Sequence, residues 1–329
     1  MARSDLLISL IRSGSRGDRA VFQKTAEALI AEERAKRHDV LADQLAAQLR
    51  PNGHAEPTRH GFLESGSDLL LEAKPRRSLS DLLLSEHVRS ACEELLEEHH
   101  RVDLLRSHNV EPRHRILLAG PPGNGKTSLA EALAGGLATP LLTVRYDTLV
   151  GSYLGETAQR LRRLFERARL DHCVLFFDEF ETIGKERGDL HETGEIKRVV
   201  SSLLLQIDAL PSHTVVVVAS NHPELLDRAV WRRFQLRLEL VPPNATAVRE
   251  MLRRFEDRLG GRLGVKHDTI VQALAGASFA EVEDFCADIM RRYVLSLPDA
   301  NLPLITRSRL AQLRSRFELS STRKRTRRG

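Results

Sequence analysis

The sequence predicts an α/β fold, in which helices cover a parallel sheet, together with a smaller unit made only of helices. Strand-like apolar runs alternate with helical stretches from Ser78 onward, Pro242 and Pro243 end the alternation, and residues 244–318 show helical periodicity alone. Such alternation is typical of parallel sheets, because each crossover lays a helix on one face of the sheet. The strand-like runs are Ile116–Ala119, Leu141–Val144, Cys173–Phe177, Thr214–Ala219 and Phe234–Val241.

Apolar residues at helical spacing mark a helix in each unit. In the first unit, one face of the stretch 160–168 carries Leu161, Leu164, Phe165 and Ala168. In the second unit, a wider stripe consists of Val282, Phe285, Cys286, Ile289 and Met290. Stripes of this width are typical of helices that bury one face against a neighbouring element.

The composition fits a soluble globular protein of about two domains. Of the 329 residues, 41% are hydrophobic and 29% are charged, which excludes disorder as the main state. The net charge of +5 is unevenly distributed, since residues 307–329 contain nine basic side chains and one acidic one. This segment therefore carries +8 and the rest of the chain −3. We expect a mildly acidic body with a basic, disordered end.

Cysteine usage and hydropathy predict a cytoplasmic protein. The three cysteines lie far apart without a CxxC pair, which argues against a disulfide framework and a zinc site. No apolar run approaches the roughly 20 residues that a membrane helix needs, and the first residues are too briefly apolar for a secretory signal.

The N-terminal region has its own pattern. Residues 3–49 read as two or three short amphipathic helices, and Arg50–Gly61 has two prolines, two glycines and no apolar pattern. About 50 residues make a thin core, so an adaptor module is favoured over a catalyst. The predicted organisation is a helical interaction domain at 1–50, a linker at 51–77, a large α/β unit at 78–241, a helical unit at 242–318 and a basic tail at 319–329.

The segment Gly120–Thr127 matches the P-loop pattern GxxxxGK[ST], between a predicted strand and a predicted helix. Glycines let successive backbone N–H groups point at phosphates, and the helix N-terminus adds a favourable dipole. Lys126 would reach the β- and γ-phosphates, and the Thr127 hydroxyl would bind Mg²⁺. The alternative is a simple Gly-Pro turn, which the context disfavours. The predicted nucleotide-binding residues are Pro122, Gly123, Asn124, Gly125, Lys126, Thr127 and Ser128.

Later strand ends supply the other chemical groups. Asp178 and Glu179 follow a buried strand, where Asp178 would hold Mg²⁺ and Glu179 would orient and deprotonate the attacking water. Asn221 ends the next strand, where its amide could contact the γ-phosphate or the water. Arg232 and Arg233 would stabilise transition-state charge on the nucleotide of a neighbouring subunit. Solvated strand ends and turn residues are the alternatives for each of these groups.

In this order and spacing, GPPGNGKT, LFFDE, ASN and LLDRAVWRRF resemble an AAA+ ATPase of the AAA family proper, over roughly Ser78–Phe317. The resemblance implies a P-loop NTPase fold with a five-stranded parallel sheet in the order 5-1-4-3-2, a small helical lid, and assembly into a ring, usually a hexamer. It also implies ATP and Mg²⁺ as cofactors, Asn221 as sensor 1, and Arg232 and Arg233 as arginine fingers acting in trans.

The resemblance also implies a substrate-gripping loop at Tyr153 and Leu154. At this position the family places an aromatic–aliphatic pair that faces the central pore of the ring. An aromatic ring suits a grip on extended polypeptide, because it contacts backbone and side chains without sequence selectivity. Alternatively, Tyr153 packs inside its own domain. The segment Gly188–Glu195 is a candidate second pore loop.

The chain departs from the family pattern in two places. Where family members commonly have Ser-Gly-Ala at the start of the last lid helix, this chain has Ser278-Phe279-Ala280, which puts adenine contacts from the lid in doubt. No HExxH motif occurs, which excludes relatives with their own zinc protease site, so proteolysis would need a separate partner protein.

The leading hypothesis is a ring-forming, Mg-ATP-dependent motor that threads, unfolds or remodels protein substrates through a central pore, recruited by residues 1–50. The alternative is a nucleic-acid-linked AAA+ ATPase, such as a helicase loader or transposition regulator, because the +8 end could neutralise phosphates. Against it, the body is acidic and no stacking aromatics interrupt the basic run. An adaptor that binds nucleotide without turnover is disfavoured by the presence of Glu179 and both arginines.

Overall fold

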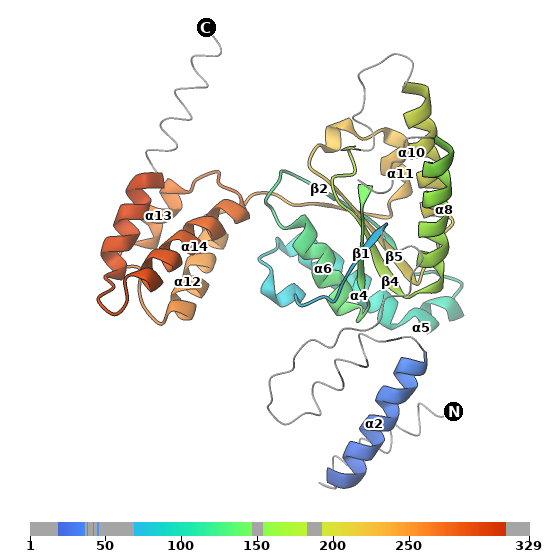
Figure 1. The fold of residues 1–329 in the computed structure, drawn as a ribbon, viewed down its shortest axis with the longest axis horizontal. Helices are drawn as coiled ribbons and strands as arrows, with labels where there is room; N and C mark the ends of the chain where they lie inside the picture. Colours follow the sequence, from blue (N-terminus) through green and yellow to red (C-terminus); the bar gives the residue numbers. More distant parts are fainter. Residues whose placement is uncertain are drawn as a thin grey trace. The chain divides into compact units, whose positions relative to one another are not determined.

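A computed structural model describes residues 19–36, 69–146, 154–182 and 193–313, together with residues 38, 42 and 45 (Figure 1). The chain divides into two compact units. The first contains the sheet and its helices and ends at Glu239. The second begins at Leu240 and is helical, and residues 120–126 group with it. The P-loop motif therefore packs with the helical unit, although it continues directly from a strand of the sheet.

The sheet has six strands in the order β1-β3-β4-β5-β2-β6. The four pairs from β3 to β6 along this order are all parallel, whereas β1 pairs antiparallel with β3. Numbered along the chain without β1, the five parallel strands lie in the order 5-1-4-3-2. The strands are β1 (Leu70–Ala73), β2 (Arg115–Ala119), β3 (Leu141–Val144), β4 (Cys173–Phe177), β5 (Thr214–Ser220) and β6 (Leu236–Glu239).

The sixth strand corrects the prediction of a five-stranded sheet. β1 lies in the range 51–77, for which the sequence predicts a linker. Only Leu70 of its four residues is buried, while Leu71 and Glu72 are exposed. Such a short edge strand has no alternation to detect, and its pairing with β3 is the interaction that makes it a strand.

The centre of the sheet is buried on both faces. Every residue of β4 and β5 is buried, as expected for parallel strands that are covered by helices on both sides. Figure 1 shows α4 and α6 on one side of the sheet and α8 and α10 on the other. The helices of this unit include α4 (Glu86–His100), α5 (Val102–Ser107), α6 (Lys126–Gly136), α8 (Leu154–Leu170), α10 (Thr193–Asp208) and α11 (Arg228–Arg233). Short 3₁₀ turns occur at η1 (Leu79–Asp81) and η2 (Pro223–Leu225).

The predicted apolar face of α8 is confirmed. Leu161, Leu164, Phe165 and Ala168 are all buried in the core cluster that contains the sheet. Phe165 stacks against Phe177 of β4 with ring centroids 6.3 Å apart. This packing fixes α8, which follows the segment of Tyr153, against the sheet.

The second unit is a small bundle with its own core. Its helices include α12 (Ala245–Leu259), α13 (His267–Ala273), α14 (Phe279–Leu295) and a helix over residues 302–313. Asn244 caps α12 through Ala247 N–H, and Gly260 ends it with a left-handed φ of 63°. The predicted stripe on α14 faces the core, with Val282, Phe285, Cys286 and Ile289 buried and Met290 packed against them.

Part of the N-terminal prediction lies within the described residues. α2 (Arg19–Ala35) corresponds to the second predicted helix, and it buries Ala26, Leu29 and Ile30. Of the third predicted helix only Ala42 and Leu45 are described. The first predicted helix, Arg50–Gly61 and the tail at 319–329 lie outside the described residues.

The three cysteines are free and buried. Burial raises the pKa of the Cys92, Cys173 and Cys286 thiols to about 12. At neutral pH they are therefore protonated packing residues rather than nucleophiles. Among the helices that the structure describes, none combines the length and the apolar character that a membrane crossing requires.

Candidate nucleotide-binding site

The P-loop folds into a tight turn between β2 and α6. Gly120 has a φ of 136° and Gly123 a φ of 76°, conformations that residues with a Cβ rarely adopt. A Cβ on Gly120 would lie 2.2 Å from the carbonyl oxygen of Leu240. Glycine at position 120 is therefore required both by the backbone angle and by the close approach of the neighbouring chain.

Lys126 is the first residue of α6 and lies over the loop. Its side chain is only 6% exposed, and Nζ donates to the carbonyl oxygens of Gly120 at 2.7 Å and Pro121 at 3.0 Å. Asn124 is also buried, and its Nδ2 donates to the same Pro121 oxygen at 3.3 Å. A buried ammonium at the start of a helix provides both a charge and a dipole for an anion. These residues fit the phosphates of a nucleotide.

The two predicted metal ligands meet in the structure. Thr127 Oγ1 donates to Asp178 Oδ2 at 2.9 Å, which joins the start of α6 to the end of β4. The backbone N–H of Glu179 donates to the other oxygen, Asp178 Oδ1, at 2.9 Å. A hydroxyl beside a carboxylate is the oxygen donor set that Mg²⁺ uses together with substrate phosphates. Within the described ranges, no group of three or more His, Cys, Asp or Glu side chains could hold a metal ion.

Glu179 lies at a sharp turn after β4. Its φ is 48°, a left-handed conformation that costs a residue with a side chain of the order of 1 kcal/mol. Thr182 supports the turn, because its Oγ1 and its backbone N–H both donate to the Glu179 carbonyl oxygen at 2.8 Å. The next residue, Phe180, is buried, whereas Glu179 is exposed. The strained turn thus directs the core residue inward and leaves the carboxylate accessible.

Asn221 is positioned by Glu181, a residue that belongs to none of the sequence motifs. Glu181 is 4% exposed, and its Oε1 accepts the Asn221 backbone N–H at 3.1 Å. The same carboxylate ties the segment after β4 to the end of β5, where Phe180 N–H also donates to Ala219 O at 2.9 Å. The position of Glu181 two residues after Asp178-Glu179 gives no sign of its role, which depends on its burial.

Two buried polar atoms beside these carboxylates have no partner among the described residues, Glu181 Oε2 and the Tyr146 hydroxyl oxygen. Burial raises the pKa of the Tyr146 hydroxyl well above its ordinary value, and three nearby carboxylates raise it further, those of Asp178, Glu181 and Glu179. Buried polar atoms normally form hydrogen bonds with protein or water. The part of the site around Tyr146 and Glu181 is therefore polar, and two of its atoms lack a hydrogen-bond partner among the described residues.

We expect Glu181→Ala to lower kcat for ATP hydrolysis by about tenfold. The Asn221 backbone N–H would lose its acceptor, and the end of β5 would no longer be held in position. Glu181→Gln keeps an oxygen at the same place and should retain most of the activity. Steady-state kinetics with both variants tests this. Equal losses in the two variants would show that the charge, and not the hydrogen bond to Asn221, is what matters.

The two arginines of α11 differ in their surroundings. Arg232 is exposed and has no hydrogen-bond or ion-pair partner in the described part of the chain. Arg233 is partly buried and forms an ion pair with Asp208, the last residue of α10. The sequence gives no reason to distinguish the two arginines, because it shows neither the burial of Arg233 nor its ion pair with Asp208.

The two predicted pore loops lie largely outside the described residues. Tyr153 and most of Gly188–Glu195 lie outside the described residues, and Leu154 is present as the first residue of α8 without a described side chain. β3 ends at Val144, so the segment of Tyr153 follows the sheet strand next to β4.

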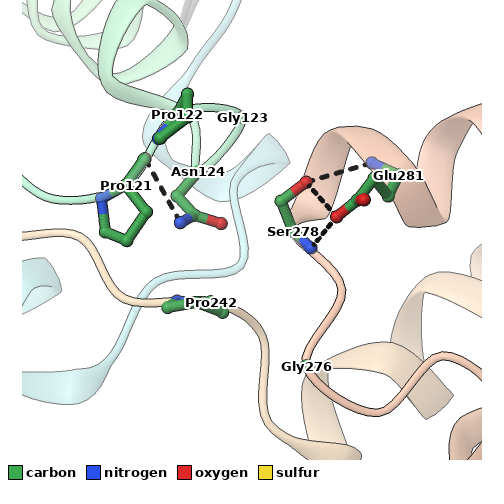
Figure 2. A pocket seen from close by; sticks show the side chains of 8 residues that line it. All are labelled: Pro121, Pro122, Gly123, Asn124, Pro242, Gly276, Ser278 and Glu281. Carbon is green, nitrogen blue, oxygen red and sulfur yellow. Dashed lines mark hydrogen bonds between the residues drawn. The ribbon is translucent and has the colours of Figure 1, made fainter. Parts of the chain in front are cut away.

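A pocket of about 380 Å³ lies between the P-loop and the start of α14, within the second unit (Figure 2). The N–H of Ala280 donates to the Gly123 carbonyl at 3.0 Å, and the N–H of Phe279 donates to Asn124 Oδ1 at 3.4 Å. The residues that line the pocket are Pro121, Pro122, Gly123, Asn124, Pro242, Gly276, Ser278 and Glu281. Phe279, which stands where family members commonly have Gly, is not among these lining residues, and its backbone N–H bonds to the lining residue Asn124.

Similarity to known proteins agrees with this geometry. The sequence pattern of the family described as "ATPase family associated with various cellular activities (AAA)" matches residues 116–241. The chain is 36% identical over 304 residues to "Uncharacterized AAA family ATPase y4kL" of Sinorhizobium fredii, and the match covers 90% of each chain. The chain belongs to the AAA family. As a member of this ATPase family, it is an enzyme that hydrolyses ATP.

Two further similarities are more distant, one in sequence and one in structure. It is 34% identical over 194 residues to "26S proteasome regulatory subunit 8 homolog" of Encephalitozoon cuniculi, which covers 56% of this chain and 49% of that protein. The chain thus matches about half the length of this relative. The crystal structure of the FIGL-1 AAA domain in complex with ADP matches with a TM-score of 0.59 at 23% identity, covering 78% of this chain and 91% of that one. That likeness establishes the AAA fold.

Proposed function

We propose that this AAA ATPase is a ring-forming, Mg-ATP-dependent machine that unfolds or remodels protein substrates. The proposal rests on the hydrogen bond between Thr127 Oγ1 and Asp178 Oδ2. This bond joins the start of α6, directly after the P-loop, to the end of β4, where Glu179 follows. The similarity to a proteasome regulatory subunit homologue supports a protein as the substrate. Residues 1–50 would recruit that substrate or a partner protein.

The roles of the residues follow from their positions. Lys126 exchanges the carbonyl oxygens of Gly120 and Pro121 for phosphate oxygens when ATP binds. Thr127 and Asp178 would hold Mg²⁺, which supplies positive charge to neutralise the triphosphate during transfer. Glu179 is accessible and would accept a proton from the attacking water. Asn221, fixed by Glu181, would orient that water or contact the γ-phosphate.

The exposed Arg232 supports a role in a neighbouring subunit. An arginine without an ion-pair partner in its own chain is available to stabilise charge on the phosphoryl group in the active site of a neighbouring subunit. Such a role requires that subunits meet head to tail, which closes into a ring when the rotation between them allows it. A hexamer is the assembly that we propose, by analogy with the AAA family.

Tyr153→Ala tests the remodelling part of the proposal. We expect this variant to hydrolyse ATP in the absence of substrate and to lose the stimulation of kcat that an unfolded polypeptide such as fluorescently labelled casein produces in the wild type. The physical reason is that an alanine side chain offers too little surface to grip an extended chain. ATPase rates with and without casein measure the effect.

Tyr153→Phe is the matched control, because it keeps the ring and removes only the hydroxyl group. It should retain the stimulation by casein. If Tyr153→Ala responds to casein as well as the wild type does, Tyr153 does not contact the substrate and the pore-loop assignment fails. That outcome would leave the nucleotide site unaffected.

A further inference from the structure

Polar groups from three neighbouring strands meet at one edge of the sheet. Tyr146 follows the end of β3, residues 178–181 follow β4, and Asn221 follows β5. β3, β4 and β5 are adjacent in the sheet and run parallel. Their carboxyl ends therefore lie at the same edge, which is where open α/β sheets bind their ligands. This topology brings Tyr146 to the carboxylates of the candidate site, although no sequence motif contains it.

The Tyr146 side chain has a buried polar end. Its ring packs against the core of the sheet unit, and its hydroxyl oxygen is buried without a hydrogen-bond partner among the residues that the structure describes. Burial, together with nearby carboxylates, raises the pKa of this hydroxyl well above its ordinary value, so it is protonated at neutral pH. The group is thus a hydrogen-bond donor, and a buried donor without an acceptor destabilises the folded state.

Glu181 has an oxygen that lacks a donor. Its side chain is 4% exposed, and its Oε1 accepts the Asn221 backbone N–H at 3.1 Å. Its Oε2 is buried and has no partner within the described ranges. Burying a carboxylate is costly unless hydrogen bonds replace its hydration. Since the Glu181 charge acts on the Tyr146 hydroxyl, a donor that needs an acceptor and an acceptor that needs a donor lie in the same buried region.

The other two carboxylates near Tyr146 are less suitable acceptors. Asp178 already accepts at both oxygens, from Thr127 Oγ1 and from the Glu179 backbone N–H. Glu179 is exposed, so that water can hydrate its carboxylate. Of the three carboxylates, Glu181 alone combines a buried oxygen with the lack of a donor in the described part of the chain.

We propose that the Tyr146 hydroxyl is the hydrogen-bond donor for Glu181 Oε2, and that Tyr146 is thereby a positioning residue for Asn221. The connection takes one bridging water, because the two atoms form no direct hydrogen bond and buried waters commonly join polar atoms that otherwise lack partners. With both oxygens bound, the Glu181 carboxylate is fixed and in turn fixes the Asn221 backbone. The inference rests on the proposed function, in which Asn221 orients the attacking water or contacts the γ-phosphate.

Tyr146→Phe tests the hydrogen bond without any nucleotide, because it removes only the hydroxyl group and keeps the ring in the core. Loss of a hydrogen-bonded hydroxyl destabilises the fold, whereas loss of an unsatisfied buried one relieves a desolvation penalty. We expect the temperature of thermal unfolding of the full chain to fall by about 3 °C. In the Glu181→Ala background the same change should not lower it, since the acceptor is already gone.

Steady-state kinetics tests the positioning role. Tyr146→Phe should lower kcat for ATP hydrolysis by about fivefold, which corresponds to the loss of one hydrogen bond. KM for ATP should stay unchanged, because the P-loop is left intact. The double variant Tyr146→Phe/Glu181→Ala should be no slower than Glu181→Ala alone, because both changes break the same connection. Tyr293→Phe is the matched control, since Tyr293 packs against the core of the helical unit, and it should keep the wild-type kcat.

The outcomes separate this inference from the proposed function. If Tyr146→Phe raises the unfolding temperature, or lowers kcat equally with and without Glu181, the hydroxyl does not bind Glu181 and the positioning role is wrong. If Asn221→Ala retains full kcat, the role of Asn221 in the proposed function fails, while the unfolding temperatures still identify the hydrogen bond. Glu181→Met, which has a similar length and no carboxylate, replaces Glu181→Ala if the latter does not fold.

Discussion

Glu179→Gln should lower kcat for ATP hydrolysis by about 10³-fold, because an amide cannot accept the proton of the attacking water. ATP affinity should change little, since the substitution leaves in place Lys126, which we propose to contact the phosphates, and Thr127 and Asp178, which we propose to hold Mg²⁺. The substitution preserves size, and Gln can adopt the same strained turn at a φ of 48°. Phosphate release measures kcat, and titration with a fluorescent ATP analogue measures the affinity.

The same variant should accumulate assembled rings in the presence of ATP, because bound nucleotide is no longer consumed. Size-exclusion chromatography with and without ATP detects this shift. Glu224→Gln is a suitable control, since this exposed glutamate follows Asn221 closely and pairs with His222. Normal turnover by Glu179→Gln would contradict the assignment of Glu179 as the catalytic base.

Lys126→Ala should weaken ATP binding by about 100-fold or more. Charge-assisted hydrogen bonds from an ammonium to phosphate oxygens are among the strong ones, and a buried position excludes competing water. The Lys126 side chain is 6% exposed and already lies against the loop, so little reorganisation accompanies its contact with phosphate. Isothermal titration with ATP and Mg²⁺ gives the affinity directly.

Lys74→Ala is the control for Lys126→Ala, because lysine is rare in this chain and Lys74 is exposed just after β1. It should bind ATP as the wild type does. Thermal unfolding shows whether the Lys126 variant remains folded, since the carbonyl oxygens of Gly120 and Pro121 lose their donor. Unchanged ATP affinity in a folded Lys126→Ala protein would refute the role given to this lysine.

Local patterns explain which parts of the fold could be predicted. Each central strand is a run of buried apolar residues, and the P-loop glycines and Lys126 act within a few residues of one another. β1 could not be predicted, because one buried leucine in four residues has no periodicity and its strand partner lies about 70 positions further along. Its assignment depends on the tertiary fold.

The same distinction applies to the site. The meeting of Thr127 with Asp178 was predictable, since both follow parallel strands and the motifs define their roles. Glu181 was not, because a buried carboxylate and an exposed one look alike in sequence. The pairing of Arg233 with Asp208 joins residues 25 positions apart through two different helices. Two adjacent arginines in the sequence give no indication that one forms an ion pair and the other is exposed.

The bonds between the P-loop and α14 have a mechanical consequence. The first N–H groups of a helix have no partners inside it. In α14 the first two donate to Asn124 and Gly123, and Ser278 Oγ accepts the third, from Glu281. The loop that would bind the phosphates thus also caps the amino end of α14. A movement of that loop would therefore break or carry along the hydrogen bonds that begin α14.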